Sequence, residues 1–523
     1  MNTLRPQSLS MLLAVVATTL AALAACSTVS TAPAPSSLPP LTEAEMPPPE
    51  PREFRAAWVA TVANIDWPSK PGLSAQAQRT EALAMLDRAR QIGLNALILQ
   101  VRPAADAIYP SALEPWTEYL SGEQGRGPWL VGETAWDPLA FWVAQAHQRG
   151  IELHVWFNPY RARQQSAKSP MSPQHLSVRQ PTLVKRYGEQ LWMDPGEPAA
   201  AAQTLAVVAD VLRRYEVDGV HIDDYFYPYP IAQAGGGGDV PFPDDESFSR
   251  YVVSGGTLAR DDWRRANVDT LVQALYQTVL RERPGARLGV SPFGIGRPDR
   301  RPPGITGFSQ YDKLYADVEL WFQKGWMDYL APQLYWPIDR TGQQFPVLLD
   351  YWLAQNTAQR HVWAGLFTSL VTKGEPLGPR SWAAREIIDQ VAVQRSRSGS
   401  SGHIHFSMAA LMHDRDGLTT QLQTGAYAVP ALVPPTPWRS SAPQPAPPQP
   451  PVLQLLAGQA VIEPAAGSPV TQWAVWRRSG RQWRFAVQPA AERTVSTTGA
   501  DALVVSAVDR WGQLSSRNAV RLP

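Results

Sequence analysis

Residues 218–228 join a short strand pattern to two adjacent acids and a group of aromatic side chains: Asp218-Gly219-Val220-His221-Ile222-Asp223-Asp224-Tyr225-Phe226-Tyr227-Pro228. Apolar residues at positions 220 and 222 alternate with polar ones at 221 and 223, so one pair faces helices and the other a barrel lumen or a cleft. A carboxylate there is costly unless it is paired or takes part in chemistry. Acids beside aromatic rings suit a sugar-binding cleft, because rings stack on pyranoses while carboxylates handle protons. The alternative is an acid that only caps a helix or forms an ion pair.

Strand-like apolar runs alternate with longer helical patterns on both sides of this segment, as in βα units with a parallel sheet. The eight candidate strands are residues 54–61, 96–101, 152–157, 219–223, 288–292, 329–333, 362–367 and 403–407. The helical patterns between them are residues 76–92, 138–149, 198–215, 261–283, 344–354 and 380–397. Eight such units predict an α/β fold of the (β/α)8 TIM-barrel type. A doubly wound open sheet is the alternative, but no Gly-rich phosphate fingerprint follows the first strand.

Long segments follow several of these strands, at residues 103–137, 158–186, 229–260 and 293–316. They are the βα loops of a barrel, and active sites of such barrels are built on that side. The barrel is expected to span residues 52–429. Composition agrees with a globular chain, since 44% of the residues are hydrophobic and 20 are Trp, while a net charge of +1 gives no reason to expect nucleic acid as a partner.

The two ends of the 523-residue chain differ from this pattern. Residues 27–51 and 430–451 are rich in proline, which predicts an extended tether and an extended linker without a core. Residues 452–523 contain short alternating stretches, which predict a small β-sandwich. Its final strands are similar to those of a fibronectin type III module. For this tail, binding or spacing is a better expectation than catalysis, and division or cell-wall proteins are its candidate partners.

The first 26 residues have the pattern of a secretory signal. Arg5 precedes an apolar run from Met11 to Ala25 that is too short for a typical transmembrane helix. The run ends in Leu23-Ala24-Ala25-Cys26, which resembles a bacterial lipobox and predicts lipidation of Cys26, the one cysteine of the chain. By resemblance to lipoprotein sorting in two-membrane bacteria, Ser27 after the cysteine implies a place in the outer membrane, facing the periplasm. The alternative is a plain signal peptide with a chance cysteine.

Polar and aromatic residues stand at the ends of most candidate strands, and a barrel would gather them around one bowl. The expected substrate-binding residues are Asn64, Asp66, Trp67, Arg102, His154, Trp156, Asn158, Tyr160, Arg161, His221, Tyr225, Gln333, Tyr335, Trp336 and His405. Each one has a plain structural alternative. Asn64 and Asn158 could make turns, and His154 could be a satisfied lumen histidine.

Hydrolysis of a glycosidic bond normally needs two carboxyl groups. Asp223 is the expected nucleophile or stabilising carboxylate, because it shares a strand face with His221. Asp224 is either the acid or the group that orients Asp223. Two close carboxylates cannot both ionise freely, so one pKa should rise and the other fall. Asp317 is a second candidate acid, with a helix N-cap as the alternative.

Other catalytic chemistries have weaker support. His403-Ile404-His405, with His413-Asp414 nearby, could begin a metal site, but no further ligand set is evident. The pair is expected to form hydrogen bonds or line the substrate site, so neither metal nor cofactor is expected. A Ser-His-Asp hydrolase is disfavoured because no Gly-x-Ser-x-Gly elbow occurs at a strand-to-helix turn.

Four segments together resemble the glycosyl-hydrolase-like family 10: residues 52–68, Trp156-Phe157-Asn158-Pro159-Tyr160-Arg161, residues 218–228 and Ala331-Pro332-Gln333-Leu334-Tyr335-Trp336. The resemblance covers about residues 52–425. It implies a barrel that cuts peptidoglycan glycan strands stripped of their peptides, in the periplasm. The 218–228 motif is also similar to the Asp-Gly-x-x-x-Asp pattern of amylase-like barrels, whose second Asp is the nucleophile, which corresponds to Asp223. Those enzymes place an acid Glu after the fifth strand, where this chain has Ser291-Pro292-Phe293-Gly294 and no acid. The resemblance therefore does not identify the proton donor.

The sequence therefore predicts a lipid-anchored periplasmic glycoside hydrolase that acts on peptidoglycan glycan. The alternative function is that of a noncatalytic glycan-binding lipoprotein that positions cell-wall enzymes. Such a protein would keep the aromatic residues and the tail without needing an acid.

Overall fold

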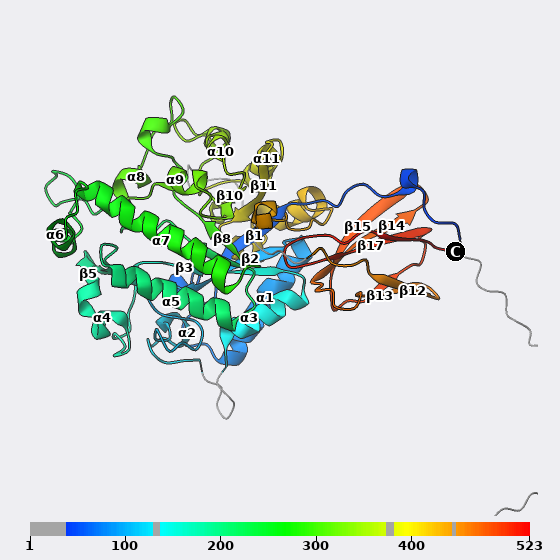
Figure 1. The fold of residues 1–523 in the computed structure, drawn as a ribbon, viewed down its shortest axis with the longest axis horizontal. Coiled ribbons are helices and arrows are strands. Elements are labelled where there is room, and N and C mark those ends of the chain that lie inside the picture. The colour runs from blue at the N-terminus through cyan, green and yellow to red at the C-terminus, as the bar shows by residue number, and fades with distance from the viewer. Residues whose placement is uncertain (1–37, 129–135, 373–380, 442–445) are drawn as a thin grey trace, which may run out of the picture. The chain divides into compact units, whose positions relative to one another are not determined.

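The computed structural model describes residues 38–128, 136–372, 381–441 and 446–523 (Figure 1). Residues 40–523 form one compact unit, separate from residues 1–39. The predicted signal peptide with Cys26 and residues 27–37 of the predicted tether lie outside the described residues. Within the described ranges, no helix has both the length and the apolar character needed to span a membrane.

Eight parallel strands close into a barrel in the order β1-β11-β10-β9-β8-β7-β3-β2, which confirms the predicted (β/α)8 fold. Their bounds are β1 (Phe54–Val59), β2 (Ala96–Arg102), β3 (Glu152–Phe157), β7 (Gly219–Ile222), β8 (Arg287–Val290), β9 (Tyr329–Leu330), β10 (His361–Leu366) and β11 (Ser400–His405). β1 pairs with both β2 and β11, so the first and last strands complete the closed sheet.

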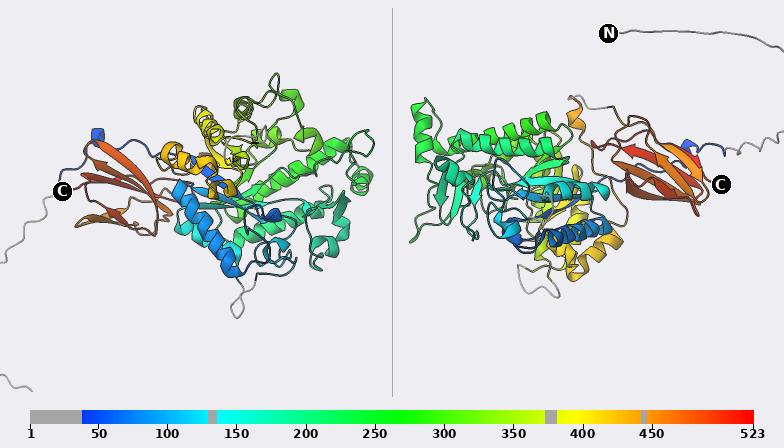
Figure 2. Two further views of the ribbon diagram at one scale, coloured as in Figure 1. Left: turned by 180° about the vertical axis from the view of Figure 1, so that it is seen from behind. Right: turned by 90° about the horizontal axis from the view of Figure 1, so that it is seen from below.

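Helices surround the barrel and follow its strands along the chain (Figure 2). The longer ones are α1 (Ala75–Ile92), α3 (Pro138–Gln148), α5 (Pro198–Arg214), α6 (Asp245–Val253), α7 (Arg260–Glu282), α10 (Phe345–Ala354) and α11 (Ala384–Arg395). Local signals set their ends: the Ser74 side chain accepts from the Ala77 N–H at the start of α1, and Gly93 ends it in the left-handed conformation.

The βα loops carry shorter elements. These are α2 (Glu118–Ser121), α4 (Leu176–Arg179), α8 (Gln310–Lys313), α9 (Val318–Gln323), the 3-10 turn η2 (Val62–Asn64) and a small antiparallel sheet of β4 (Arg161–Arg163), β6 (Gln190–Met193) and β5 (Val184–Tyr187). Two short helices, α12 (Met408–Met412) and α13 (Leu418–Gln421), follow the last strand.

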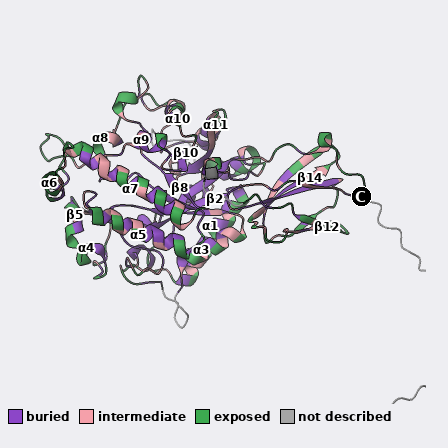
Figure 3. Ribbon diagram, viewed as in Figure 1, coloured by how far each residue is buried: buried purple, intermediate pink, exposed green. Residues whose placement is uncertain are grey.

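The buried residues of the barrel, purple in Figure 3, form two layers. Alternate strand residues fill the lumen, where Phe54 of β1 stacks on Trp363 of β10 with 3.7 Å between ring centroids. The other residues of each strand pack against the helices in a larger cluster. Glycines make room for large lumen side chains, because a Cβ at Gly289 would collide with the ring of Tyr329.

The tail is a small domain of two antiparallel sheets, as the alternating pattern predicts. One sheet contains β12 (Val452–Leu456), β13 (Gln459–Glu463) and β16 (Thr494–Ser496); the other contains β15 (Gln482–Pro489), β14 (Gln472–Ser479), β17 (Ala502–Val508) and β18 (Asn518–Arg521). Buried apolar residues of both sheets, including Ile462, Trp473 and Leu503, form its core.

Parts of the two proline-rich segments are packed, although their composition predicts extended chain without a core. Leu432 pairs with Arg52 as a parallel bridge at the entry to β1. Arg439 is buried, forms an ion pair with Asp328 and donates to the Ala286 carbonyl at 2.6 Å. Anchoring side chains between the prolines thus fix residues 430–441 on the barrel.

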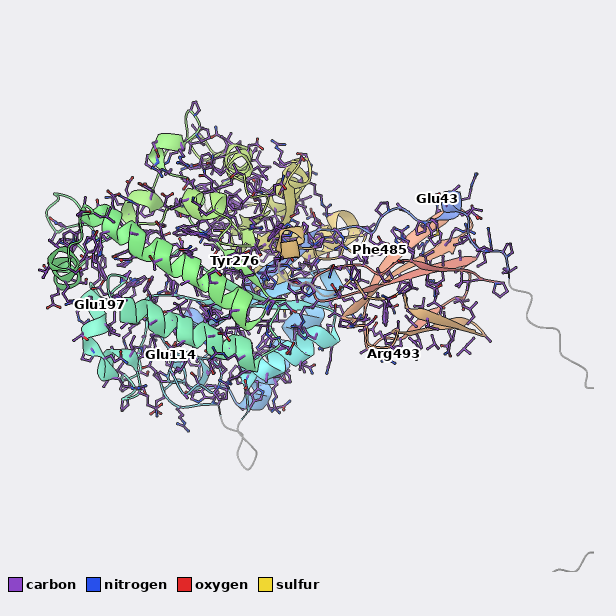
Figure 4. All side chains as sticks on the ribbon, in the orientation of Figure 1. Glu43, Glu114, Glu197, Tyr276, Phe485 and Arg493 are labelled. Carbon is purple, nitrogen blue, oxygen red and sulfur yellow. The ribbon has the colours of Figure 1, made fainter. Side chains whose placement is uncertain are left out.

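The described part of the N-terminal tether lies on the tail, where Leu41 and Met46 pack against the cluster that contains Phe485, labelled in Figure 4. Arg517 donates to the Pro47 carbonyl at 2.8 Å, and Arg521 pairs with Glu45 at 2.6 Å. Residues 41–50 therefore belong to the fold of the tail.

The tail contacts the barrel at the N-terminal ends of its strands. Gln472 donates to the carbonyl of Gly150, before β3, at 2.7 Å, and Arg510 pairs with Glu216, before β7, at 2.8 Å. Arg52, before β1, donates to the Gly512 carbonyl at 2.9 Å. The opposite end of the barrel, where the strands end, is thereby left to the βα loops.

Candidate active site

A cavity of about 280 Å³ opens at the C-terminal ends of the barrel strands. We call it the acid cavity, and its lining is Trp58, Val62, Ile65, Gln100, Trp156, Arg161, Gln164, Asp223, Asp224, Tyr225, Tyr229, Ser291, Gln333, Tyr335 and Phe406. Active sites of (β/α)8 barrels lie at this end, because loops from several strands converge there. The cavity combines two carboxyls with several aromatic rings.

Asp223 follows β7 directly and is 3% exposed. Trp156 donates its indole N–H to one carboxylate oxygen at 2.9 Å, and the Asn158 amide lies 3.4 Å from each oxygen. Burial raises the pKa of Asp223 to about 7, against the lowering effect of the nearby Arg161 charge, and the charge of Asp224 adds to the rise. Its partners are hydrogen-bond donors, so the surroundings are arranged to receive an ionised carboxylate.

Asp224 is equally buried and accepts a short hydrogen bond from the hydroxyl of Tyr229. Burial raises its pKa above the ordinary range, although Tyr229 and the Gln333 amide oppose the rise. The sequence predicts opposite shifts for the two acids, and the structure corrects this. Desolvation acts on both carboxyls and outweighs the donors around each of them.

Arg161 supplies a positive charge at the cavity wall and stacks over the ring of Tyr225, with 4.0 Å between guanidinium carbon and ring centroid. The Asn158 side-chain oxygen accepts from the Arg161 backbone N–H at 2.8 Å, which fixes the turn after β3. Asn158 thus contacts Asp223 and also shapes the loop that carries Arg161.

Arg102 lies beneath this loop and has no exposed surface. It pairs with Glu114, labelled in Figure 4, and donates to the Asn158 carbonyl at 2.6 Å. The sequence predicts contact with substrate for Arg102. The structure places it outside the cavity lining, where it supports the loop that holds Asn158.

A column of hydrogen bonds runs down the lumen beneath the acid cavity. His221 Nε2 faces the indole N–H of Trp58 at 3.1 Å and the hydroxyl of Ser291 at 2.9 Å. Its Nδ1 lies 3.0 Å from the hydroxyl of Tyr329, which lies 2.9 Å from Nδ1 of His154. Nε2 of His154 reaches the Glu152 carboxylate at 3.2 Å, completing what we call the lumen column.

The donors fix the tautomers of this column. An indole N–H can only donate, so Nε2 of His221 accepts and its Nδ1 carries the proton. Tyr329 then accepts from His221 and donates to Nδ1 of His154, which leaves Nε2–H of His154 to donate to Glu152. Burial lowers the pKa of His221 well below its usual value, in agreement with a neutral ring. His221 and His154 thus lie in the lumen as predicted, below the acid cavity rather than in its lining.

Several predicted binding residues have structural roles outside the acid cavity. Asp66 accepts from the Ser407 hydroxyl at 2.7 Å and from the Ala409 N–H at 2.8 Å. Trp67 is core, with its indole N–H on the Gln78 carbonyl. Tyr160 is fully buried core as well.

Three more predicted residues are also absent from the lining. Asn64 donates to the carbonyls of Pro68 and Tyr119. Trp336 packs on Phe293 with 5.6 Å between centroids. His405 points away from the lumen and contacts the Tyr427 hydroxyl at 2.8 Å.

Asp317 is a helix cap rather than a cavity residue. Its carboxylate accepts from the Leu320 N–H at 3.2 Å at the start of α9 and contacts Arg297 at 3.2 Å. A short side chain at this position satisfies the free N–H groups of the first turn. The structural alternative for Asp317 is therefore the one observed.

His403 and His405 share a strand face, as their spacing predicts, but the face is the outer one. Both ring systems contact the hydroxyl of Tyr427, and His403 also faces Gln394 while His405 faces Thr368. Among the described residues, no group of three or more His, Cys, Asp or Glu side chains is arranged to hold a metal ion.

The structure adds cavity residues that the sequence did not single out. Trp58, Gln164, Tyr229 and Phe406 all line the acid cavity. The alternation along β1 could have indicated Trp58, since it shares a face with the lumen residue Phe54. Gln164 and Tyr229 lie in loops, for which no periodicity applies.

Comparisons with known proteins show which proteins the chain is similar to. The model of the glycosyl hydrolase-like 10 family matches residues 53–379. The chain is 38% identical over 392 residues to glycosyl hydrolase YngK of Bacillus subtilis (strain 168), covering 74% of each chain. It is 33% identical over 318 residues to glycosyl hydrolase DigH of Escherichia coli (strain K12), covering 57% of this chain and 69% of that one.

Among solved structures, the chain is similar to the glycoside hydrolase domain of PgaB (BpsB) from Bordetella bronchiseptica. The TM-score is 0.47 and the sequence identity 12%, over 71% of this chain and 98% of that one.

Proposed function

The chain belongs to the glycosyl hydrolase-like 10 family, and from that membership we propose that it is a glycoside hydrolase that cleaves O-glycosidic bonds with Asp223 and Asp224. The observation that supports this most is the placement of both carboxyls in one buried, aromatic-lined cavity at the catalytic end of the barrel. Most glycoside hydrolases use a pair of carboxyl groups as catalytic residues, and aromatic rings beside them can stack on the sugar.

The surroundings of the two acids assign their roles in this proposal. Asp223 receives N–H donors from Trp156 and Asn158 and lies near the Arg161 charge, so its ionised form faces the positive charge that develops at the anomeric carbon. Asp224, with its raised pKa, gives its proton to the glycosidic oxygen as the bond breaks. The resulting Asp224 carboxylate then takes a proton from the attacking water.

The substrate in this proposal is the glycan of peptidoglycan, in strands that lack peptides. The motif resemblance and the lipobox-like sequence before Cys26 support this choice, because a lipid-anchored protein of the outer membrane facing the periplasm meets that polymer. The tail would then be available for division or cell-wall partners. No metal or cofactor takes part.

The decisive experiment uses protein that lacks residues 1–26 and peptide-free glycan strands of defined length. We expect wild type to release saccharides that mass spectrometry identifies, and Asp223→Asn to lower the rate by about a thousandfold while keeping an acceptor for the Trp156 N–H. Equal release by wild type and variant would remove Asp223 from the mechanism.

One observation favours a noncatalytic glycan-binding protein as the second candidate. The two acids of the cavity are neighbours in sequence, and the other lining residues carry no carboxyl. Tight binding of peptide-free glycan without any product, beside a hydrolase that cuts the same sample, would establish that role instead.

A further inference from the structure

A second cavity, of about 430 Å³, adjoins the acid cavity on the same end of the barrel. We call it the lysine cavity, and its lining is Ala63, Asn64, Ser69, Lys70, Pro71, Glu118, Tyr119, Gly122, Ser166 and Lys168. The loops that follow β1, β2 and β3 supply these residues. None of them was assigned a role in catalysis.

At two places, residues that are near neighbours in the sequence line different cavities. Across η2, Val62 and Ile65 line the acid cavity, whereas Ala63 and Asn64 between them line the lysine cavity. Ala63 and Asn64 have left-handed φ angles of 52° and 54°, which turns this pair away from its neighbours.

After β4 the same division recurs, with Gln164 on the acid cavity and Ser166 on the lysine cavity. Ile65, which lines the acid cavity next to Asn64 of the lysine cavity, is 48% exposed and offers an apolar surface to a sugar face. The loops after β1 and β3 thus contribute to both cavities.

The lysine cavity offers two uncompensated positive charges. Lys70 and Lys168 are exposed, and neither ammonium has an ion pair or hydrogen bond within the described parts of the chain. By contrast, Lys185 pairs with Glu246 at 3.0 Å and Lys313 with Asp239 at 2.6 Å. Two free ammonium groups on one cavity favour a ligand that carries an anion.

The acids near the cavity already have donors. Glu118 lines it, but its oxygens accept from the backbone N–H groups of Lys168, at 3.0 Å, and Ser169, at 2.6 Å. Glu81, next to Ser69, accepts from that residue's backbone N–H at 2.9 Å and from its hydroxyl. These carboxylates shape the loops, and the two ammonium groups stay available.

The cavity also contains a buried polar atom suited to a sugar hydroxyl. Tyr119 is 6% exposed, and within the described residues its hydroxyl forms no hydrogen bond of normal geometry, although Ser166 lies close to it. A ligand that gives this buried hydroxyl a well-aligned hydrogen bond gains affinity.

We propose that the lysine cavity is a subsite for a sugar that carries a free carboxylate, with Lys70 and Lys168 as its recognition groups. This inference rests on the proposed function and narrows its substrate. Alternate sugars of peptidoglycan glycan carry a lactyl ether, whose carboxylate is charged only when no peptide is joined to it. In this proposal the two lysines bind the lactyl carboxylate of strands that lack peptides.

The test compares peptide-free glycan as the free acid with the same glycan as its methyl ester, at low ionic strength, where exposed ion pairs are strongest. We expect wild type to show a kcat/KM about fivefold higher for the free acid, the size expected of two exposed ion pairs. The double variant Lys70→Met/Lys168→Met should bring this ratio close to one, and Lys70→Arg/Lys168→Arg should retain it.

Lys324→Met is the matched control, because Lys324 is an exposed lysine that follows α9, on the way to the opposite end of the barrel. Its ratio should equal that of wild type. A wild-type ratio of one, or a Met double variant with the wild-type ratio, overturns the subsite and leaves hydrolysis standing.

Failure of hydrolysis itself would look different, since wild type would then release sugar from neither form. Equilibrium binding of the same two glycans decides the subsite in that case. Tighter binding of the free acid by wild type, lost in the Met double variant, supports it, and equal affinity for both forms overturns it.

Discussion

Burial of Asp223 raises its pKa to about 7 and thereby links the stability of the fold to pH. The folded state binds a proton that the unfolded state releases near its ordinary pKa of 3.8, so the contribution of Asp223 to the free energy of unfolding falls as pH rises from about 4 to 7. Asp223→Asn has no such proton. We expect the variant to exceed wild type by a few kcal/mol at pH 8 and to differ little at pH 4, as measured by denaturant unfolding.

Asp317→Asn is the comparison, since Asp317 caps α9 and forms an ion pair with Arg297 while remaining partly exposed. It is expected to lose a little stability at pH 8, the opposite direction. An Asp223→Asn advantage that is the same at pH 4 and pH 8 would contradict the linkage.

The same proton sets the expected pH dependence of catalysis. If the ionised form of Asp223 is the reactive one, kcat/KM for glycan hydrolysis should rise as pH increases through about 7. Rates measured from pH 5 to 9 with a constant ionic strength test this. A rate that falls through pH 7 would reverse the roles of Asp223 and Asp224.

Individual residues differ in how far sequence predicts them. Alternation along β7 indicated the lumen side for Asp223, and the same rule holds for Trp156 on β3. The spacing of His403 and His405 gives a shared face but not which face, because both sides of a barrel strand are buried. Asp317 shows a different limit, since a cap and a catalytic acid use the same residue type.

The lumen column connects elements that are far apart in the sequence, and Tyr329 is its central member. Tyr329→Phe leaves Nδ1–H of His221 and Nδ1 of His154 without partners in a fully buried site. We expect a loss of about 2 kcal/mol in the free energy of unfolding. Tyr160→Phe is the matched control and should be close to neutral, because the buried Tyr160 hydroxyl has no hydrogen-bond partner among the residues that the structure describes. Equal losses for both variants would show that the column adds no stability.

At the scale of elements, strand positions were predicted better than strand ends. β9 is limited to Tyr329–Leu330, shorter than the predicted 329–333, since Pro332 cannot donate to the sheet. β11 begins at Ser400 rather than 403, within a Gly- and Ser-rich stretch that carries no strand pattern. Pairing with formed neighbours, which propensity does not see, decides such ends.

At the scale of the molecule, residues 430–441 join the tail to the barrel, and Arg439 is their main anchor. Burial acts to raise the pKa of Asp328, but the charge and hydrogen bonds of Arg439 outweigh this effect, so the net shift of the pKa is downward. Such a carboxylate adds stability above its unfolded pKa, which is lost as pH falls through the folded value. Arg439→Ala should therefore cost about 3 kcal/mol in chemical unfolding at pH 7 and less near pH 3.

Arg300→Ala serves as the control. It removes one exposed surface charge and should change the free energy of unfolding very little. A pH-independent loss in Arg439→Ala would mean that packing rather than the ion pair is responsible. Composition could not predict this anchor, because the amino-acid composition of a proline-rich segment is the same whether or not its one arginine is buried in the folded protein.

The pairing of β1 with β11 also determines the order in which the chain can be completed. β1 is the first barrel strand to be synthesised, and its partner β11 is the last. Arg52, just before β1, likewise donates to the carbonyl of Gly512, which lies 460 residues later in the chain. Until Ser400–His405 has emerged, β1 and β10 each keep an unpaired edge, and such edges associate with other chains. Nascent chains that end before β11 would therefore need a chaperone to prevent association. In the complete barrel, β11 pairs with both β1 and β10, and these edges are no longer free.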